Sequence, residues 1–534
     1  MRSSGTSQLK TIYPACRAFL DDDTWNALLA EYADEKNTRS FEELLAHRIR
    51  EPGVPEFLPG LARLEHAIAE TAQRGDLIST SVERREINPT LTLIEASWSG
   101  LPSLIDSRDG PPRNPPEQGE EQLLVWYHPK SKTVQYRSAT SEDLLVLKMI
   151  AEDIDPRLVA REGAVPIGAV EAAIDRAVEA GLILEPRTLI RRDSGDSTAW
   201  QGIDERFLES SFFTIQWHIT QVCDLHCRHC YDRSRRSPLT LEAGIDILDD
   251  LAAFCASRHV RGQVSFSGGN PLLHPHFFDL YRAASERGFV TAILGNPASQ
   301  ENLERIVEIQ KPSHYQVSLE GLEEYNDYIR GDGNYGNVMV FLPILRDLGI
   351  KAHIMLTLNR DNIDQVLPLA EVLRNEADSF TFNRLSQVGE GVQLAIPSRD
   401  EYRDFLIDYV EAAKMNPVMT LKDNLINIIL HKRGEGLFGG CAGYGCSAAF
   451  NFIAILPDGE VHACRKFPSY IGNVNHQSIG EIYDSDAALR YRAGTQACKS
   501  CSIRPVCGGC LAVMYGQGLD IFEARDPHCF YHSL

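Results

Sequence analysis

The chain has 534 residues, of which 43% are hydrophobic and 24% charged, and its formal net charge is -21. This length allows roughly three to four domains, and so acidic a chain is a poor non-specific ligand for nucleic acid or for an anionic membrane. It contains no run of about 18 apolar residues and no N-terminal apolar signal core, so we expect a cytoplasmic protein with neither nucleic acid nor membrane among its partners. Thirteen cysteines in that compartment indicate metal ligands rather than disulfides.

The first 187 residues predict two domains. Residues 1–87 space apolar side chains as helices do at 22–32, 40–49 and 58–70, and predict a helical domain of unknown role. Residues 88–187 predict strands at 90–98, 122–127 and 133–137, with a flexible loop from Asp109 to Gln122, followed by helices at 141–152, from Pro156, and at 166–181. Three strands followed by three helices predict a winged-helix-like domain, which could bind a peptide or DNA.

A polar linker is expected at residues 188–210, and strands then alternate with helices over residues 211–395. The expected strands are 214–220, 263–267, 290–294, 315–319, 352–358 and 379–384. The fold class is therefore α/β, with six β/α units that form a parallel sheet curled into a partial barrel. Active sites of such barrels lie at the carboxyl ends of the strands. A helical bridge at 396–440 and a cysteine-rich region at 441–534 complete the chain.

The loop after the first barrel strand carries Cys223, Cys227 and Cys230. Thiolates are suitable ligands for iron-sulfur clusters, and three of them leave one iron of a four-iron cluster open, whereas a zinc knot is the alternative. The spacing resembles the CxxxCxxC loop of the radical SAM superfamily. This resemblance implies that the open iron binds S-adenosylmethionine (SAM), whose reductive cleavage gives a 5′-deoxyadenosyl radical. The three cysteines would then be catalytic as well as metal ligands.

The same resemblance implies further SAM contacts. Ser267-Gly268-Gly269-Asn270 resembles the GGE motif that holds the amino group of SAM, with Asn270 in place of Glu, so the charge term of that contact is lost. Paired glycines would let the backbone approach the ligand. Ser318 and Arg330 correspond to residues that grip the SAM carboxylate, although a capped strand end and a solvated arginine are the structural alternatives. His229 occupies the position of an aromatic side chain that stacks on adenine.

Eight cysteines follow residue 440, and a hairpin that turns at Asp458-Gly459 is expected to deliver one of them, Cys464. Two zinc knuckles would also use eight thiolates. The order resembles the SPASM domain of peptide-modifying radical SAM enzymes, although one residue fewer than usual separates the last two cysteines of its CxxC run. The resemblance implies three 4Fe-4S clusters in all. The two auxiliary clusters would be held by Cys441, Cys446, Cys464 and Cys510, and by Cys498, Cys501, Cys507 and Cys529.

Cys16 and Cys255 stay outside these sets, and Cys255 is expected in the core of an apolar helix. The resemblance implies an oxidoreductase that removes a hydrogen atom from a ribosomally synthesised peptide. Residues 88–187 resemble a PqqD-like peptide-recognition element, to which the leader of the precursor peptide adds as a strand. An electron donor such as flavodoxin or ferredoxin is the second expected partner.

We expect a thioether crosslink as the product. Epimerisation and carbon-carbon crosslinking remain alternatives, as does formylglycine formation of the sulfatase-maturase kind. That last family carries an Asp after its hairpin cysteine, where this chain has Cys464-Arg465-Lys466. An alternative of another class is a winged-helix DNA-binding regulator with a redox-sensing cluster region.

Overall fold

The structure, a computed structural model, describes residues 5–34, 39–79, 82–106, 116–192, 200 and 202–531. The chain divides into two compact units, Met1–Leu158 with Val170–Arg187, and Val159–Ala169 with Thr188–Leu534. Each unit has a hydrophobic core of its own. Among the described residues, no helix combines the length and the apolar content needed to cross a bilayer.

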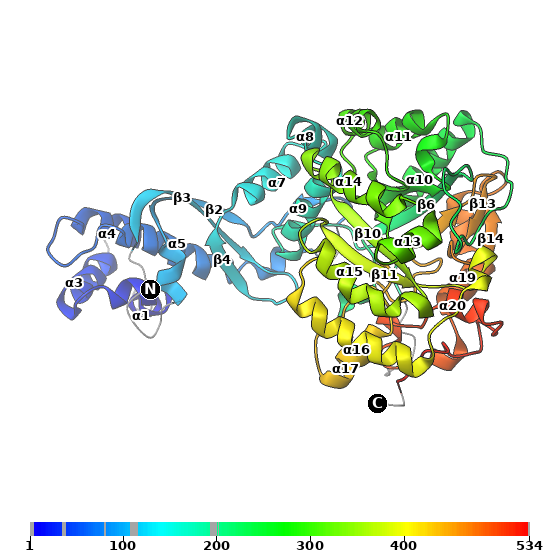
Figure 1. Cartoon of the computed structure of the whole chain (residues 1–534). Helices are drawn as coiled ribbons and strands as arrows, with labels where there is room; N and C mark the ends of the chain where they lie inside the picture. The colour runs from blue at the N-terminus through cyan, green and yellow to red at the C-terminus, as the bar shows by residue number, and fades with distance from the viewer. Residues whose placement is uncertain are drawn as a thin grey trace. The chain divides into compact units, whose positions relative to one another are not determined.

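The first unit packs N-terminal helices against a three-stranded antiparallel sheet of order β2-β3-β4 (Figure 1). Side-chain caps start two of the helices, since Asp21 accepts a hydrogen bond from the Thr24 N–H at 2.7 Å and Ser40 forms a capping box with Glu43. The elements are α1 (Gly5–Ile12), α2 (Pro14–Ala18), α3 (Asp22–Ala33), α4 (Phe41–Arg48), α5 (Leu58–Thr71), β2 (Thr92–Ser99), α6 (Leu101–Asp106), β3 (Glu117–Tyr127) and β4 (Val134–Ser138).

One core joins these helices to the sheet. It contains Trp25, Phe41 and Leu61 of the helices together with Ile94 of β2 and Leu123 of β3. Apolar side chains from both sides of the predicted boundary at residue 87 are buried together. The stability of the sheet therefore depends on the helices that precede it in the chain. Sequence periodicity locates elements but does not say which faces they share.

Three helices follow the sheet: α7 (Ser141–Ala151), α8 (Pro156–Glu162) and α9 (Ile167–Glu179). After them β5 (Ile183–Leu184) pairs antiparallel with β1 (Glu86–Ile87). Asp143 lies in the capping box of α7 and also accepts two hydrogen bonds from Arg137 of β4, at 2.6 and 2.7 Å. The expected order of strands and helices is present. The flexible loop predicted from Asp109 to Gln122 is wrong from residue 117 onward, because Glu117 pairs with Ser99, and residues 107–115 lie outside the described residues.

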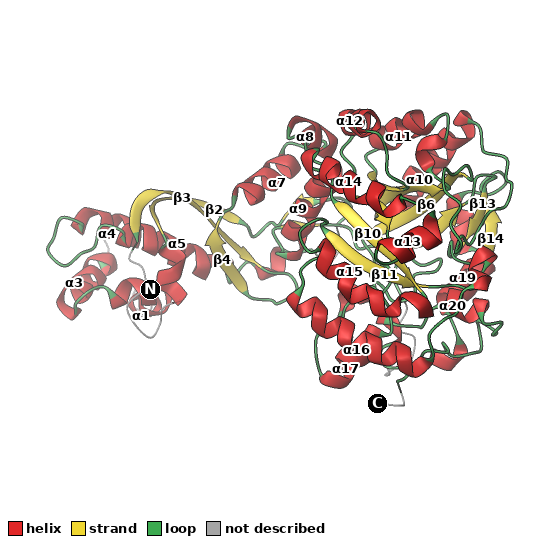
Figure 2. Cartoon of the chain, in the orientation of Figure 1, coloured by secondary structure: helices red, strands yellow, loops and turns green. Residues whose placement is uncertain are grey.

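The second unit contains six parallel strands that neighbour one another in chain order. All six were predicted to within about two residues, and Figure 2 shows helices lying around this sheet. The strands are β6 (Phe212–Thr220), β7 (Arg261–Gly268), β8 (Val290–Leu294), β9 (Tyr315–Ser318), β10 (Ala352–Leu358) and β11 (Ser379–Arg384). The helices between them are α10 (Leu241–Arg258), α11 (Phe277–Glu286), α12 (Gln300–Ile309), α13 (Glu323–Arg330), α14 (Asn334–Asp347) and α15 (Val366–Leu373).

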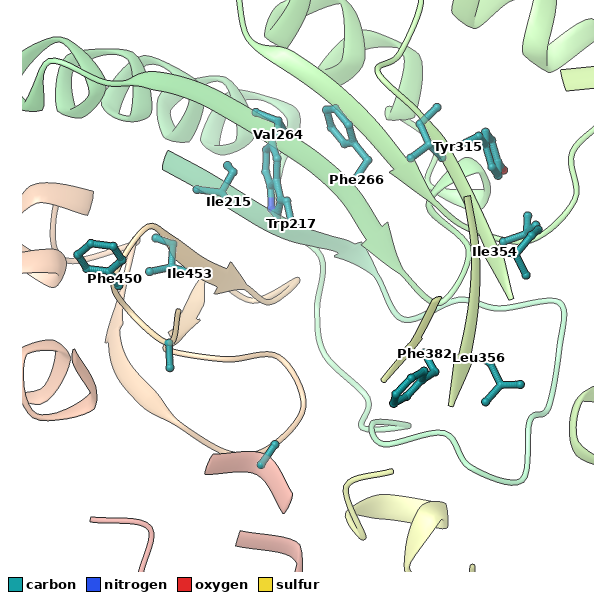
Figure 3. Close-up of a cluster of buried hydrophobic side chains, with 14 of the residues drawn as sticks. Ile215, Trp217, Val264, Phe266, Tyr315, Ile354, Leu356, Phe382, Phe450 and Ile453 are labelled. Carbon is teal, nitrogen blue, oxygen red and sulfur yellow. The ribbon is translucent and has the colours of Figure 1, made fainter. Parts of the chain in front are cut away.

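The C-terminal hairpin extends this sheet. Its strands β12 (Phe452–Ile455) and β13 (Glu460–His462) pair antiparallel around the predicted turn, and β14 (Tyr470–Asn473) pairs with β13. β12 also pairs in parallel with β6, which gives nine strands in the order β11-β10-β9-β8-β7-β6-β12-β13-β14. Figure 3 shows the buried side chains that continue across this junction, with Phe450 and Ile453 beside Ile215 of β6.

The predicted helical bridge contains two helices, α16 (Arg399–Met415) and α17 (Ile426–Arg433), followed later by α18 (Ile479–Asp484), α19 (Asp486–Ala493) and α20 (Leu511–Gly516). Residues 416 to 425 of the predicted bridge are not helical. Pro417 disfavours a helical backbone at Asn416, whose side chain donates to the Ala370 carbonyl at 3.0 Å. The non-helical stretch that results carries Lys422.

Candidate active site

A cavity of about 370 Å³ lies at the carboxyl ends of the barrel strands. We call it the loop cavity, because the loop after β6 contributes Cys223, Cys227 and Cys230 to its lining. Residues predicted to contact SAM line the same cavity, and they come from the loop itself, the end of β7, the end of β9 and α13: His229, Ser267, Gly268, Gly269, Ser318 and Arg330. Of the predicted site residues in this half, only Asn270 is not part of the lining.

The two glycines pack against the start of the cysteine loop. A Cβ on Gly268, whose φ is +130°, would lie 2.0 Å from the Thr220 carbonyl oxygen, and one on Gly269 would lie 2.2 Å from that of Val222. The Gly269 N–H donates to Thr220 at 2.9 Å. The glycines are thus required by contact between two backbone segments, a reason that differs from the ligand approach suggested by the sequence.

Glu320 was missed by the sequence analysis, although it follows Ser318 by two residues. Its side chain is 1% exposed, and Oε1 lies 3.3 Å from His229 Nε2 and 3.4 Å from Arg330 Nη1. Oε2 accepts the Thr357 N–H at 2.7 Å. Burial acts to raise the pKa of Glu320, but His229, Arg330 and Thr357 favour the ionised form and leave that pKa lowered. A buried carboxylate between two basic side chains was not readable from one sequence.

Asn270 lies behind the lining, where its amide has partners within the protein. Its Oδ1 accepts the Leu272 N–H at 3.3 Å, and its Nδ2 donates to Asp224 Oδ1 at 3.2 Å. Asn296, which follows β8 and lines the loop cavity, donates to the same Asp224 oxygen at 2.5 Å and to Cys223 Sγ at 3.6 Å. Two amides from neighbouring strand ends therefore converge on one carboxylate of the cysteine loop.

The eight C-terminal cysteines line two further cavities. One, of about 160 Å³, is lined by Cys441, Cys446, Cys464 and Cys510, and we call it the first auxiliary cavity. The other, of about 20 Å³, is lined by Cys498, Cys501, Cys507 and Cys529. The structure thus brings the cysteines together in the two sets of four that the SPASM resemblance implied, including Cys507 and Cys510 with their short spacing.

These thiols are poor nucleophiles as they stand. Burial raises the pKa of Cys446 to about 12 and that of Cys498 to about 11, and it raises the pKa of Cys464 and Cys507 as well. Such thiols lose their proton when the sulfur coordinates a metal centre. In the described part of the chain, no three His, Cys, Asp or Glu side chains are gathered as closely as a single metal ion requires.

Basic side chains surround the first auxiliary cavity. Lys422, Arg465 and Lys466 line it, and among the described residues none of the three forms an ion pair with a carboxylate. Burial lowers the pKa of Lys422, whose Nζ donates to the Cys441 carbonyl at 3.2 Å. The site therefore favours a group that carries negative charge, as thiolate-ligated clusters do.

The loop cavity and the first auxiliary cavity adjoin. They share side chains from the ends of β8 to β11 and from the segment after β13: Leu294, Gln316, Met355, Asn383, Arg384, Arg465 and Lys466. Arg384 is 3% exposed and binds Asp423 at 2.8 Å and Asp526 at 2.9 Å, and Asp526 accepts the Cys510 N–H at 2.8 Å. The last barrel strand is thereby tied to a cysteine of the auxiliary set.

The predicted linker also reaches this region. Arg192 is half-buried and donates to the carbonyl oxygens of Tyr444 and Cys446, at 2.8 and 2.9 Å. Ile190 is fully buried in the core of the second unit. Residues 193–199 lie outside the described residues. At least the first residues of the predicted linker therefore support the auxiliary site.

Comparison with known proteins agrees with this geometry. The model of the radical SAM superfamily matches residues 217–373, and the SPASM model, an iron-sulfur cluster-binding domain, matches residues 446–510. The chain contains a radical SAM domain and a SPASM domain. This radical SAM protein is 25% identical to an AdoMet-dependent heme synthase of Methanosarcina barkeri, over 59% of its own length and 96% of that protein's. It is 26% identical to the subtilosin biosynthesis protein AlbA of Bacillus subtilis, over 57% of its own length and 67% of AlbA's.

Among solved structures, Streptococcus suis SuiB bound to the precursor peptide SuiA aligns with a TM-score of 0.49 and 16% identity, covering 76% of this chain and 96% of SuiB. The residues of the radical SAM protein fit SAM. His229 Nδ1 and Arg330 Nε are buried without a hydrogen-bond partner in the described structure, and both belong to residues that line the loop cavity. Orphaned donors and acceptors of this kind are satisfied when a polar ligand binds.

Proposed function

We propose that this radical SAM enzyme modifies a ribosomally synthesised peptide and forms a thioether crosslink in it. The observation that carries the proposal is the set of side chains shared by the loop cavity and the first auxiliary cavity. A substrate held there faces Cys223, Cys227 and Cys230 on one side and an auxiliary cysteine set on the other. SAM and a reduced cluster supply, when bound, the radical that takes a hydrogen atom from the substrate.

The chain's own residues then have separate tasks. Cys223, Cys227 and Cys230 would hold the SAM-binding cluster, while Glu320 orients His229 toward adenine and Arg330 toward the SAM carboxylate. Thioether formation removes the carbon hydrogen as an atom and the thiol hydrogen as a proton, and it leaves one electron to be accepted. The auxiliary clusters, which bring the total to three, would accept this electron. The positive charges of Lys422, Arg465 and Lys466 would stabilise the additional negative charge on the reduced cluster.

A peptide substrate is supported by the first unit. Among the described residues, β4 pairs only with β3, so its other edge is available to an added strand. The relation to AlbA, a protein of bacteriocin biosynthesis, supports the same class of substrate. The partners we propose are a precursor peptide with a leader and a flavodoxin or ferredoxin as electron donor.

The proposal is tested with a peptide encoded by a short open reading frame beside the gene. The reconstituted enzyme, SAM, reductant and peptide are incubated without oxygen, and the product is analysed by tandem mass spectrometry. A loss of two hydrogens together with one cysteine that no longer reacts with iodoacetamide supports a thioether. A loss of two hydrogens with full alkylation would mean a carbon-carbon bond, and deuterium at one α-carbon without that loss would mean epimerisation.

A second candidate follows from the relatives. Heme synthases, an Fe-coproporphyrin III synthase and a pre-heme d1 synthase are all related to this chain at 24 to 26% identity. The substrate would then be a tetrapyrrole whose propionates meet Arg465 and Lys466. The heme synthase of M. barkeri and AlbA each leave about two fifths of this chain unmatched, so coverage does not separate the two candidates, and the free edge of β4 is what favours the peptide. Decarboxylation of iron coproporphyrin III by the reconstituted enzyme, with no change in any candidate peptide, would establish the alternative.

A further inference from the structure

The carboxylate that this chain lacks at position 270 is present at position 224. The sequence analysis located an amide, Asn270, where the GGE motif carries a glutamate. In the structure the side chain of Asn270 points its Nδ2 at Asp224 Oδ1, 3.2 Å away. An amide and a carboxylate therefore lie side by side at the position where the GGE motif has only a glutamate.

The hydrogen bonds fix how these groups are oriented. An ionised carboxylate only accepts hydrogen bonds, so Asn270 and Asn296 must both turn their NH₂ groups toward Asp224. Asn270 is 4% exposed and its Oδ1 already accepts the Leu272 N–H, so it is poorly placed to bind a ligand. Both amides bond to Oδ1 of Asp224, and in the described structure Oδ2 accepts no hydrogen bond.

Asp224 is not itself among the residues that line the loop cavity, but it stands between two that are. Its neighbours Cys223 and Leu225 line the loop cavity, as does Asn296. Asp224 itself is exposed, so its negative charge costs little before a ligand arrives. We propose that Asp224 replaces the missing glutamate and accepts a hydrogen bond from the amino group of SAM, while Asn270 and Asn296 hold its carboxylate in place.

The chemistry favours a carboxylate at this point. A hydrogen bond to a charged acceptor is roughly twice as strong as one between neutral groups, and an amide carbonyl alone would lose that difference. The two asparagines are positioning residues, because they bond to Asp224 and act on the amino group through it. The inference requires only that the chain binds SAM, so its failure and that of the peptide proposal are distinguishable.

The test measures SAM binding rather than turnover. Equilibrium dialysis with labelled SAM is performed on the anaerobically reconstituted full chain, and iron content is determined for every variant. Asp224→Asn keeps an oxygen that can accept from both amides but removes the charge, and we expect it to weaken SAM binding about tenfold or more. Binding of 5′-methylthioadenosine, which has no amino acid portion, should not change.

The charge swap supplies the decisive variant. Asp224→Asn combined with Asn270→Glu returns a carboxylate beside a carboxamide and should recover most of the lost affinity. Asn270→Glu alone places two carboxylates side by side and should not tighten binding. Unchanged SAM affinity in Asp224→Asn would overturn the inference. So would an equal loss for methylthioadenosine, or loss of the cluster in both Asp224→Asn and the swap variant, since either would assign Asp224 to loop structure.

Discussion

The Oε1 atom of Glu320 lies 3.3 Å from Nε2 of His229 and joins the end of β9 to the cysteine loop. Because Arg330 binds the same oxygen, one buried carboxylate orients two side chains of the loop cavity. Glu320→Gln keeps the size of the side chain and its bond to Thr357 but removes the charge. We expect SAM to bind about tenfold more weakly, as removal of one partner of a buried ion pair leaves the others unpaired.

The control for this variant is Glu323→Gln, a change of the same chemistry at an exposed position three residues further along the chain. It should leave SAM affinity and thermal stability unchanged. Both variants are compared by equilibrium dialysis with labelled SAM after equal iron content is established. Equal SAM affinity in Glu320→Gln and in the unaltered chain would show that Glu320 only supports the fold.

Iron content tests the cysteine assignments. Three clusters correspond to about twelve irons for each reconstituted chain, and replacing Cys223, Cys227 and Cys230 by Ala should leave about eight. Replacement of Cys498, Cys501 and Cys507 should likewise remove one cluster and spare the others. Cys255→Ala is the control, because Cys255 is 5% exposed in α10 and its burial raises the pKa to about 12. Stoichiometric zinc instead of iron would rule out the cluster assignment.

The free edge of β4 is tested by proline. On either side of β4, the Ala139 N–H donates to Gln122 of β3 and the Thr133 carbonyl accepts from His128, which follows β3. In the regular ladder between them the Val134 N–H therefore points away from β3. Val134→Pro removes that donor without breaking the ladder to β3, and it should weaken binding of the leader peptide about tenfold. Fluorescence anisotropy with the full-length enzyme measures this.

The matched control lies on the other edge of the same sheet. Leu93 of β2 is 49% exposed, and in the register of β2 with β3 its N–H points outward. Leu93→Pro should therefore leave peptide binding unchanged if the leader adds to β4. The reverse result would place the leader on β2. Tight, salt-sensitive binding of duplex DNA with no binding of peptide would favour the regulator considered above.

Lys422 provides a test of the first auxiliary site. Removing a half-buried positive charge disfavours addition of an electron nearby, so Lys422→Met should lower the reduction potential of one cluster by tens of millivolts. Lys414→Met, at an exposed lysine of α16 paired with Glu411, should leave all potentials unchanged. Redox titration followed by electron paramagnetic resonance distinguishes the two. A Lys422→Met enzyme with unaltered potentials would mean that this lysine does not face a cluster.

The interactions of Asp143 lead us to expect that the local stability of α7 depends on pH. Burial acts to raise its pKa, but the bonds from Arg137 and Thr140 lower it to about 2. The stabilisation is therefore present above the unfolded value of about 3.9 and is lost as the pH falls toward 2. Arg137 is 38% exposed, so we expect only about 1 kcal/mol after screening.

Hydrogen exchange at the α7 amides, expressed as an opening free energy, measures this contribution. The unaltered chain should lose it between about pH 4 and about pH 2, whereas Asp143→Asn should lack it at neutral pH already. Glu142→Gln, which removes an exposed pair with Arg176, is the control and should change little. The same pH profile for Asp143→Asn and the unaltered chain would contradict the prediction.

The sequence predicted most of what depends on local spacing. All six barrel strands and the turn at Asp458-Gly459 can be read from apolar periodicity and turn residues, whereas the two sets of four cysteines were implied by the resemblance to the SPASM domain. Contacts between segments that are distant in the sequence were not predicted. Glu320, Asp224 and Asn296 belong to no motif that the sequence analysis used. Their contacts form only because the fold brings the strand ends close to the cysteine loop. The pairing of β12 with β6 likewise depends on a free sheet edge that no single segment encodes.

The pairing of β12 with β6 limits how cluster domains can be exchanged between related enzymes. Four residues of β12, Phe452 to Ile455, lie in register with Thr214 to Trp217 of β6, the strand that leads directly into the cysteine loop. A cluster domain borrowed from a relative must therefore bring a strand whose inward side chains suit those of β6. Chimeras joined only at the linker before the domain should fold poorly, whereas chimeras that exchange β6 and β12 as a pair should keep the spacing of their redox centres.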